Sequence, residues 1–301
     1  MNPNIPPLKP AISLEDQIKR LTSRNLIIQD PDFAKKTLQK ISYYRFTGYL
    51  LPFKTSTGNY RNGTTFEHVS NIYEFDSKLR LHLLRLCEHI EIQMRAHFSY
   101  FLAMQHVSDP LCYRNPSCFQ FRSSEQFAKF ITKWDENLDR SSEIFIKHHR
   151  SNYGGRFPIW VAIEVLTFSN LSTFFSNFKP SDKRDIAKSY LLKTPNLLEN
   201  WLHGFSVLRN KCAHFSRLYY TFLGKDVLLS KNAVALKLNR KKLYALIFSA
   251  KYFVTDREFW SDWVNELESL VINHQHTLNL SFLGFIPNWK LHLLSKPTDT
   301  Y

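Results

Sequence analysis

The chain has 301 residues, and 44% of them are hydrophobic, which is ample for a buried core and argues against disorder over most of the sequence. Its 40 lysines and arginines outnumber its 26 acidic residues and give a formal net charge of +14. Such a surplus attracts polyanions, so nucleic acid is the expected partner, although many basic proteins bind none specifically. With only 8 glycines and 13 prolines, the sequence favours a mainly α fold over an all-β one.

The cysteines and the N-terminal sequence indicate in which cellular compartment the protein is expected. The four cysteines form no C-x-x-C pair, and free thiols in a reducing compartment are favoured over a small disulfide loop between Cys112 and Cys118. Residues Met1–Pro7 lack a signal-peptide pattern, and no apolar run is long enough to span a bilayer. We expect a cytoplasmic protein that does not enter a membrane and that needs neither a metal nor a small-molecule cofactor.

The N-terminal part is expected to form an extended arm followed by two short helices. The proline-rich arm covers residues 1–12. Ser13 is an N-cap candidate followed by two acidic residues, and its helix should run to about Ser23. Asp30 and Pro31 give a second cap-plus-proline start, for a helix that reaches about Ile41.

An aromatic-rich segment, Ile41–Phe53, contains Gly48 and Pro52 and is expected to end regular helix. Its rings could stack RNA bases around Arg45, which is a candidate RNA contact. The more common role of such rings is to seal the short helices onto the main body. A polar loop over residues 54–63 then closes an expected N-terminal subdomain, residues 13–63.

The longest helical pattern follows and runs to about Ala103. Thr64 and Glu67 fit a capping box at its start. On a different face, Glu91 and Arg95 form either a solvated ion pair or part of a site between helices, and Arg95 is a candidate RNA contact. One apolar stripe consists of Ile72, Phe75, Leu79, Leu83, Leu86, Ile90, Met94, His97 and Phe101.

The remaining elements complete an expected helical domain, residues 64–289, with a tail over residues 290–301. The apolar stretch from Ile159 to Phe178 should be the buried centre of a bundle. A loop is expected over residues 106–123, followed by a helix from Ser124 to Leu138 that could continue after Ser141 to His149. Further helices are expected from Pro180 to about Leu192, from Pro195 through the motif described next, and around residues 240–254 and 257–274.

The stretch Leu208–Tyr219 carries an unusual set of polar candidates: Arg209, Asn210, Lys211, His214 and Arg217. If the helix continued, a polar ridge would consist of His203, Ser206, Asn210, His214 and Arg217. Arg209 and His214 lie five residues apart, or about 140° around a helix. The helix must therefore distort, the arginine must reach round, or two copies of the helix must pool their residues.

These residue types suit RNA cleavage without a metal. Histidine titrates near neutrality and can transfer the protons of the 2′-hydroxyl and the leaving 5′-oxygen. The arginine fork matches phosphate oxygens and keeps its charge. The alternative is that Arg209 and His214 only satisfy carbonyls at a helix C-terminus, where cations are stabilised.

Arg209–His214 matches the R-x4-6-H signature of HEPN-fold ribonucleases. Together with Ser216–Leu218 it resembles the R-N-x-x-A-H-x-x-R-L box of the abortive-infection Abi family of AbiD- and AbiF-like proteins. The resemblance extends over roughly residues 13–289. Further landmarks in the same order are Tyr43–Tyr49, Gly63–Phe66, Ile90–Arg95 and Pro158–Leu166.

This resemblance implies a HEPN-like helical bundle with additional N-terminal and C-terminal helices, and endoribonuclease activity in phage defence or toxin-like growth arrest. It makes Arg209 and His214 catalytic and Asn210 supporting. Lys211 and Arg217 are candidate RNA contacts because of their positive charge beside the motif. The family box often has a second histidine and an asparagine where this chain has Phe215 and Tyr220. One motif per chain implies a homodimer, although a structured noncoding RNA could organise the complex instead.

A rival hypothesis is a non-catalytic scaffold that grips RNA phosphates through its positive surface. A third is a helical protein-interaction module whose preference for RNA is incidental. Cleavage that depends on His214 would separate the first hypothesis from both.

Overall fold

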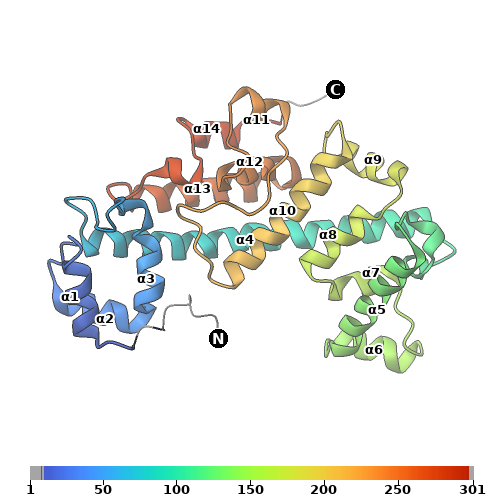
Figure 1. Ribbon diagram of the computed structural model, residues 1–301. Coiled ribbons are helices and arrows are strands. Elements are labelled where there is room, and N and C mark those ends of the chain that lie inside the picture. Colours follow the sequence, from blue (N-terminus) through green and yellow to red (C-terminus); the bar gives the residue numbers. More distant parts are fainter. Residues whose placement is uncertain (1–7, 9, 298–301) are drawn as a thin grey trace. The chain divides into compact units, whose positions relative to one another are not determined.

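The computed structural model describes residue 8 and residues 10–297, and the regular elements in this part of the chain are all helices (Figure 1). Only isolated bridges pair extended backbone there, at Ile27 with Thr65, Lys54 with Tyr60 and Phe119 with Phe178. The expected mainly α fold is confirmed. Residues 1–7 and 9 of the expected arm, and the last four residues of the expected tail, lie outside the described residues.

Two compact units make up the chain. The first comprises Met1–Leu79 with Ser269–Asn279, and the second Arg80–Glu268 with Leu280–Tyr301. The division falls within the long helix α4, Phe66–Gln105, and not at the polar loop 54–63.

The first unit begins with two helices that start where the sequence predicts. Ser13 Oγ accepts the Asp16 N–H at 3.1 Å, and Asp30 Oδ1 accepts the Phe33 N–H at 2.9 Å. These caps satisfy amides that lack partners in the first turn of a helix. The helices are α1, Leu14–Thr22, and α2, Pro31–Ile41.

The aromatic segment is more helical than expected, because Ser42 caps a further helix, α3, Tyr43–Tyr49. Phe46 is fully buried and stacks on Phe66 with ring centroids 4.1 Å apart, while the Tyr49 hydroxyl donates to Asp76 at 2.6 Å. These rings are therefore core residues of the first unit, in keeping with the expectation that they pack in the protein interior.

The predicted capping box at the start of α4 is wrong by one residue. The Ile27 N–H donates to the Thr64 carbonyl, the Phe66 N–H donates to the Ile27 carbonyl, and the helix begins only at Phe66. The cap is therefore Thr65, whose Oγ1 accepts the His68 N–H at 3.1 Å. Glu67 Oε1 accepts the backbone N–H groups of residues 29 and 30 instead of reaching back along its own helix.

In the second unit, the apolar stripe of α4 is buried from Leu83 to Met94. Beyond Met94 the buried positions are Phe98 and Leu102 and not the expected His97 and Phe101. Each four-residue step exceeds the 3.6-residue turn by about 40°, so successive steps rotate the buried stripe around the helix. His97 is half-buried, and its Nδ1 lies 2.7 Å from the Tyr190 hydroxyl.

The helix expected from Ile159 to Phe178 is broken at Leu166. The Trp134 indole N–H donates to the Ala162 carbonyl at 2.7 Å, so this carbonyl is engaged where a continuous helix would offer it to the Leu166 N–H. The chain tightens into a 3-10 turn, Leu166 becomes extended with ψ 135°, and Thr167 Oγ1 caps the next helix by accepting the Asn170 N–H. The resulting elements are α7, Ile159–Ala162, η4, Ile163–Val165, and α8, Phe168–Ser176.

The other helices largely match their expected positions. The fully buried helix is α12, in place of the expected 159–178 segment, and the expected tail begins with a helix. Figure 1 shows α8 beside α10, which also packs on α12. The bounds are α5 Ser124–Arg140, α6 Ile144–Asn152, α9 Pro180–Ser189, α10 Pro195–Ala213, α11 Lys231–Ala235, α12 Leu243–Phe253, α13 Arg257–Ile272 and α14 Trp289–Leu294, with 3-10 turns at Cys112–Arg114, Pro116–Cys118, Leu51–Phe53 and Leu280–Leu283.

The structure bears on two further expectations, the state of the cysteines and the absence of a membrane-spanning segment. Cys87, Cys112, Cys118 and Cys212 are all buried free thiols, so the alternative disulfide between the middle two is excluded. Among the helices that the structure describes, none combines the length and apolar character needed to cross a bilayer.

Replacing Trp134 by phenylalanine tests the indole contact that interrupts the 159–178 helix. The ring is kept, but the Ala162 carbonyl loses its donor inside the core, so the free energy of unfolding should fall by about 1–3 kcal/mol in urea titrations. Trp160→Phe is the control, because Trp160 is 51% exposed and a surface change should alter stability by less than about 0.5 kcal/mol. Equal losses in both variants would contradict the assigned role.

Protonation of the half-buried His97 should lower the stability of the folded protein in acid. Burial lowers the pKa of His97, so the unfolded chain takes up its proton at a higher pH than the folded chain does. Stability is therefore complete above the unfolded pKa, about 6.5, and falls as the pH drops below it. The variant His97→Gln should show a shallower decline in melting temperature between pH 7.5 and 5.5 than the parent protein, and parallel declines would refute the prediction.

Candidate functional site

The C-terminal end of α10 carries the candidate catalytic motif. The helix ends at Ala213 with His214 as its C-cap, and not beyond Tyr219 as a continuing pattern would require. The Ser216 N–H donates to the Lys211 carbonyl at 2.8 Å, and the Phe215 N–H donates to the Cys212 carbonyl at 3.1 Å. This pair of bonds is a Schellman motif, which satisfies carbonyls at the helix end.

Phe215 occupies the position that this motif reserves for a left-handed residue, with φ +56°. Glycine usually fills it, because a side chain there costs about 1–2 kcal/mol. The phenylalanine side chain at this position is 64% exposed. Beyond it the chain turns back into the unit, where Leu218 and Tyr219 are buried.

The predicted polar ridge does not exist as a continuous feature. Ser206 is 2% exposed and donates to the His203 carbonyl at 2.8 Å, so it belongs to the core. Arg217 lies after the helix has ended, and its direction is no longer set by helical geometry. Helical periodicity therefore relates Asn210 and His214, but not Arg217.

Arg209 lies in an open groove of about 540 Å³ on the second unit. The groove runs along one face of α4, and Arg209 enters it from α10. The α4 residues that line it are Leu81, Leu84, Arg85, Glu88, Glu91, Ile92 and Arg95. The structure thus brings together Arg209 and Arg95, two candidates 114 residues apart in the sequence.

Arg95 is held at the edge of this groove by an ion pair and a carbonyl. Its Nη2 donates to Glu91 Oε1 at 2.5 Å and to the Leu166 carbonyl at 2.7 Å, and its Nη1 lies 3.5 Å from Glu164 Oε2. Burial raises the pKa of Glu91, and the nearby guanidiniums of Arg95 and Arg209 act against that rise. The pair is thus largely buried and tied to the Leu166 carbonyl, so the alternative of a solvated surface pair is wrong.

Arg209 differs from the other arginines of the groove. Arg85 pairs with Glu266, and Arg95 pairs with Glu91. Within the part of the chain that the structure describes, the only side chain that hydrogen-bonds Arg209 is the neutral amide of Asn210, at 3.2 Å. Its charge is therefore directed into the groove without a bonded carboxylate.

Asn210 links α10 to α8. Its Oδ1 accepts from Arg209, and its Nδ2 donates to Ser169 Oγ at 3.3 Å. The sequence predicted that this amide would orient His214, but the described hydrogen bonds connect it to Arg209 and Ser169 instead. Asn210 meets His214 through the backbone, where the Asn210 carbonyl accepts the His214 N–H at 2.9 Å.

His214 is exposed at the helix end. Because its N–H makes a regular helical bond, its Cβ still follows helical geometry and points about 140° away from that of Arg209. The imidazole and the guanidinium accordingly leave different sides of α10.

The other RNA-contact candidates occupy several places. Lys211 and Arg217 are half-buried near the end of α10, and Arg217 has interactions within the chain. Arg45 belongs to the first unit, where its guanidinium lies 5.9 Å from the Tyr73 ring centroid. Within the described residues, no three His, Cys, Asp or Glu side chains gather so as to hold a metal ion.

Sequence reasoning missed Ser169 and the Leu166 carbonyl, both of which support the site. They lie on either side of the break between η4 and α8. Thr167, a good N-cap residue, was the one local signal that could have located the break.

The chain matches the family described as Abi-like protein over residues 36–220. The chain belongs to this family. The Abi-like region includes α10 and ends just after the motif, and it contains Arg95, Arg209 and His214. No curated protein and no solved structure matches the chain.

Replacing Phe215 by glycine should stabilise the protein by about 1 kcal/mol, because glycine adopts the left-handed conformation of the Schellman motif without steric cost. Urea titration of the free energy of unfolding would measure the gain. Phe222→Gly is the matched control: Phe222 is also exposed, but it is not among the residues with positive φ, and its replacement should bring no gain. A destabilised Phe215→Gly variant would contradict the strain argument.

Proposed function

We propose that this Abi-like protein is a metal-independent endoribonuclease with a HEPN-like core, acting in bacterial abortive-infection phage defence or toxin-like growth arrest. One observation carries the proposal. Arg209 is held by a neutral amide and directs its charge into an open groove, while His214 of the same motif stands exposed at the helix end. A structural capping role at a helix end would pair the arginine with a backbone carbonyl, whereas its side-chain hydrogen bond goes to the Asn210 amide oxygen.

The residues would divide the chemistry as follows. The imidazole of His214 transfers protons, and the guanidinium of Arg209 stabilises the charge that develops on the phosphorane. The ribose 2′-oxygen attacks phosphorus as its proton leaves to a base, and the P–O5′ bond breaks as O5′ gains a proton from an acid. The products are a 2′,3′-cyclic phosphate and a 5′-hydroxyl.

Asn210 is a positioning residue in this scheme. Its amide ties Arg209 to Ser169 at the start of α8, so the guanidinium is oriented by a contact between two helices. Arg95 lines the same groove in a fixed geometry, and an RNA phosphate would have to compete with Glu91 and Glu164 for its guanidinium. Lys211 and Arg217 would contact the same RNA near the helix end.

The divergence of Arg209 and His214 supports a composite site. About 140° of helix separates their Cβ directions, so one copy of α10 does not aim both groups at a single phosphate. A homodimer in which two copies of the helix end meet would bring His214 of one chain to Arg209 of the other. A structured noncoding RNA that orders two copies would serve the same purpose, in the cytoplasm where target RNA is available.

The central test is RNA cleavage by the full chain in EDTA, with product ends identified by mass spectrometry. Arg209→Ala and His214→Ala should each reduce the cleavage rate at least about 100-fold, because each removes a group that acts on the reacting atoms. Mixing the two inactive variants should restore part of the activity if the site is shared between chains. Activity lost on chelation, or unchanged in His214→Ala, would overturn the proposal.

Two matched variants serve as controls. His203→Ala removes another exposed histidine of α10, and Arg184→Ala removes an exposed arginine of α9; both should cleave RNA at the parent rate. Salt-sensitive RNA binding without cleavage in any of these proteins would favour the non-catalytic scaffold instead.

A further inference from the structure

A second cavity, of about 490 Å³, lies on the second unit and is lined by residues outside the groove of Arg209. Three segments form its walls: Asp109–Leu111 after α4, His149 and Tyr153 at the end of α6, and residues 156–160 leading into α7. The Ile159 N–H donates to the Pro110 carbonyl at 2.9 Å and joins the first wall to the third.

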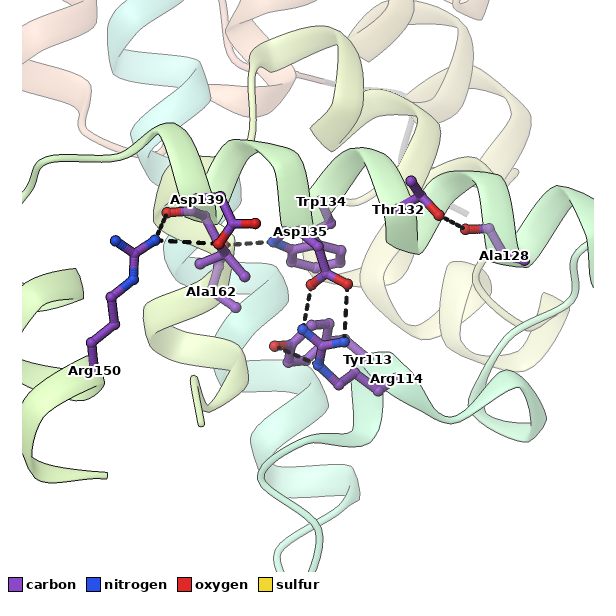
Figure 2. Close-up of polar contacts among 10 residues, drawn as sticks. Tyr113, Arg114, Ala128, Thr132, Trp134, Asp135, Asp139, Arg150 and Ala162 are labelled. Carbon is purple, nitrogen blue, oxygen red and sulfur yellow. Dashed lines mark hydrogen bonds and ion pairs between the residues drawn. The ribbon is translucent and has the colours of Figure 1, made fainter. Parts of the chain in front are cut away.

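Helix α5 contacts a residue close to each of the three walls, and Figure 2 shows these contacts. Asp135 pairs with Arg114, which follows the first wall, and Trp134 donates to Ala162 of α7. From α6, Arg150 Nη2 donates to the carbonyl of residue 138 at 2.8 Å and lies 3.4 Å from Asp139. The cavity is therefore framed by contacts from one helix and does not depend on a loose loop.

Aromatic rings face this cavity while they remain accessible. His149 and Tyr153 stack with ring centroids 4.8 Å apart and an interplanar angle of 29°. Tyr153 is 50% exposed, and Trp160 is 51% exposed. Large rings that line a pocket and stay half-exposed offer faces to a flat ligand.

Polar groups with defined roles surround the rings. Asp109 Oδ1 accepts the Leu111 N–H at 3.1 Å, which fixes the direction of the carboxylate. His149 Nδ1 lies 3.2 Å from the Arg156 carbonyl, which can only accept, so Nδ1 carries the proton and Nε2 is an acceptor in the neutral ring. Arg156 bonds the Tyr153 carbonyl through Nε at 3.4 Å, an arrangement that leaves the end of its fork for an anion.

We infer that this cavity binds an unpaired RNA base, with guanine preferred. A base has the π faces that Tyr153 and Trp160 can stack on, and its phosphate suits Arg156. Guanine presents adjacent N1–H and N2–H donors, which match a carboxylate such as Asp109, whereas adenine and uracil lack that pair. An aliphatic side chain would need neither the carboxylate nor the guanidinium, and a volume of about 490 Å³ holds a nucleotide.

This inference rests on the proposed function in that the ligand is RNA, but it does not rest on cleavage. The base site would anchor a single strand at a place separate from the groove of Arg209 and add sequence preference to a surface that otherwise attracts phosphates. Binding and cleavage can then be measured independently.

The test measures fluorescence anisotropy of a labelled single-stranded oligoribonucleotide with one central guanosine, bound to the full-length His214→Ala variant. Adding Trp160→Ala or Tyr153→Ala should weaken binding about tenfold, because each removes a stacking face. Tyr100→Ala is the matched control: Tyr100 is 67% exposed on α4 and does not line the cavity, so affinity should be unchanged. Equal affinities in all these proteins would overturn the inference.

Asp109→Asn tests the preference for guanine while keeping an oxygen to accept the Leu111 N–H. The parent should bind the guanosine oligonucleotide more tightly than its adenosine counterpart, and the variant should lose that difference. Titration with guanosine monophosphate under the same conditions, with a matching dependence on Trp160, would show that the base itself is bound. A preference that survives Asp109→Asn would refute the role of the carboxylate.

The outcomes separate this inference from the proposed function. Guanine-dependent binding that needs Trp160, in a protein that never cleaves RNA, would support the base site and remove the ribonuclease. Cleavage that needs His214, together with RNA binding indifferent to Trp160, Tyr153 and Asp109, would support the ribonuclease and remove the base site.

Discussion

The hydrogen bond from Trp134 to the Ala162 carbonyl organises much of the second unit. By engaging that carbonyl it interrupts the 159–178 segment, and the extended residue Leu166 that results has a carbonyl free of helical pairing. Arg95 donates to this carbonyl at 2.7 Å, and the new helix that starts at Phe168 sets Ser169 against Asn210. The groove of Arg209 and the frame of the aromatic cavity thus both depend on one buried indole.

The sequence predicted most helices because their signals are local. Caps at Ser13 and Asp30, and a four-residue apolar rhythm in α4, depend on neighbours in the chain. The predicted helix bounds were wrong where a residue distant in the sequence determines where a helix starts or ends. Ile27 shifts the start of α4 by backbone pairing, and Trp134 divides a stretch whose apolar pattern alone fits one helix. Hydrophobic periodicity cannot show that a carbonyl will be engaged by a side chain elsewhere.

The candidate site was predictable in its residues but not in its arrangement. The sequence motif identified Arg209, Asn210 and His214 as candidates. Helical geometry also showed that the side chains of Arg209 and His214 leave the helix in different directions. It could not show that Arg209 enters a groove with Arg95, since α4 and α10 meet through tertiary packing. Nor did it show that Asn210 supports the arginine and not the histidine, because Ser169 reaches it only after the break at Leu166.

The two places where this chain departs from the family box share a backbone property. Phe215 and Tyr220 both have φ +56°, a conformation in which asparagine and histidine are enriched among side-chain-bearing residues. A histidine or an asparagine at either position would suit this backbone conformation. The chain can keep the same turn with aromatic residues because the Schellman bonds at Lys211 and Cys212, and the burial of Leu218 and Tyr219, hold the backbone on both sides. The turn that follows His214 is therefore fixed by these backbone bonds and buried side chains and does not require a particular side chain at position 215 or 220.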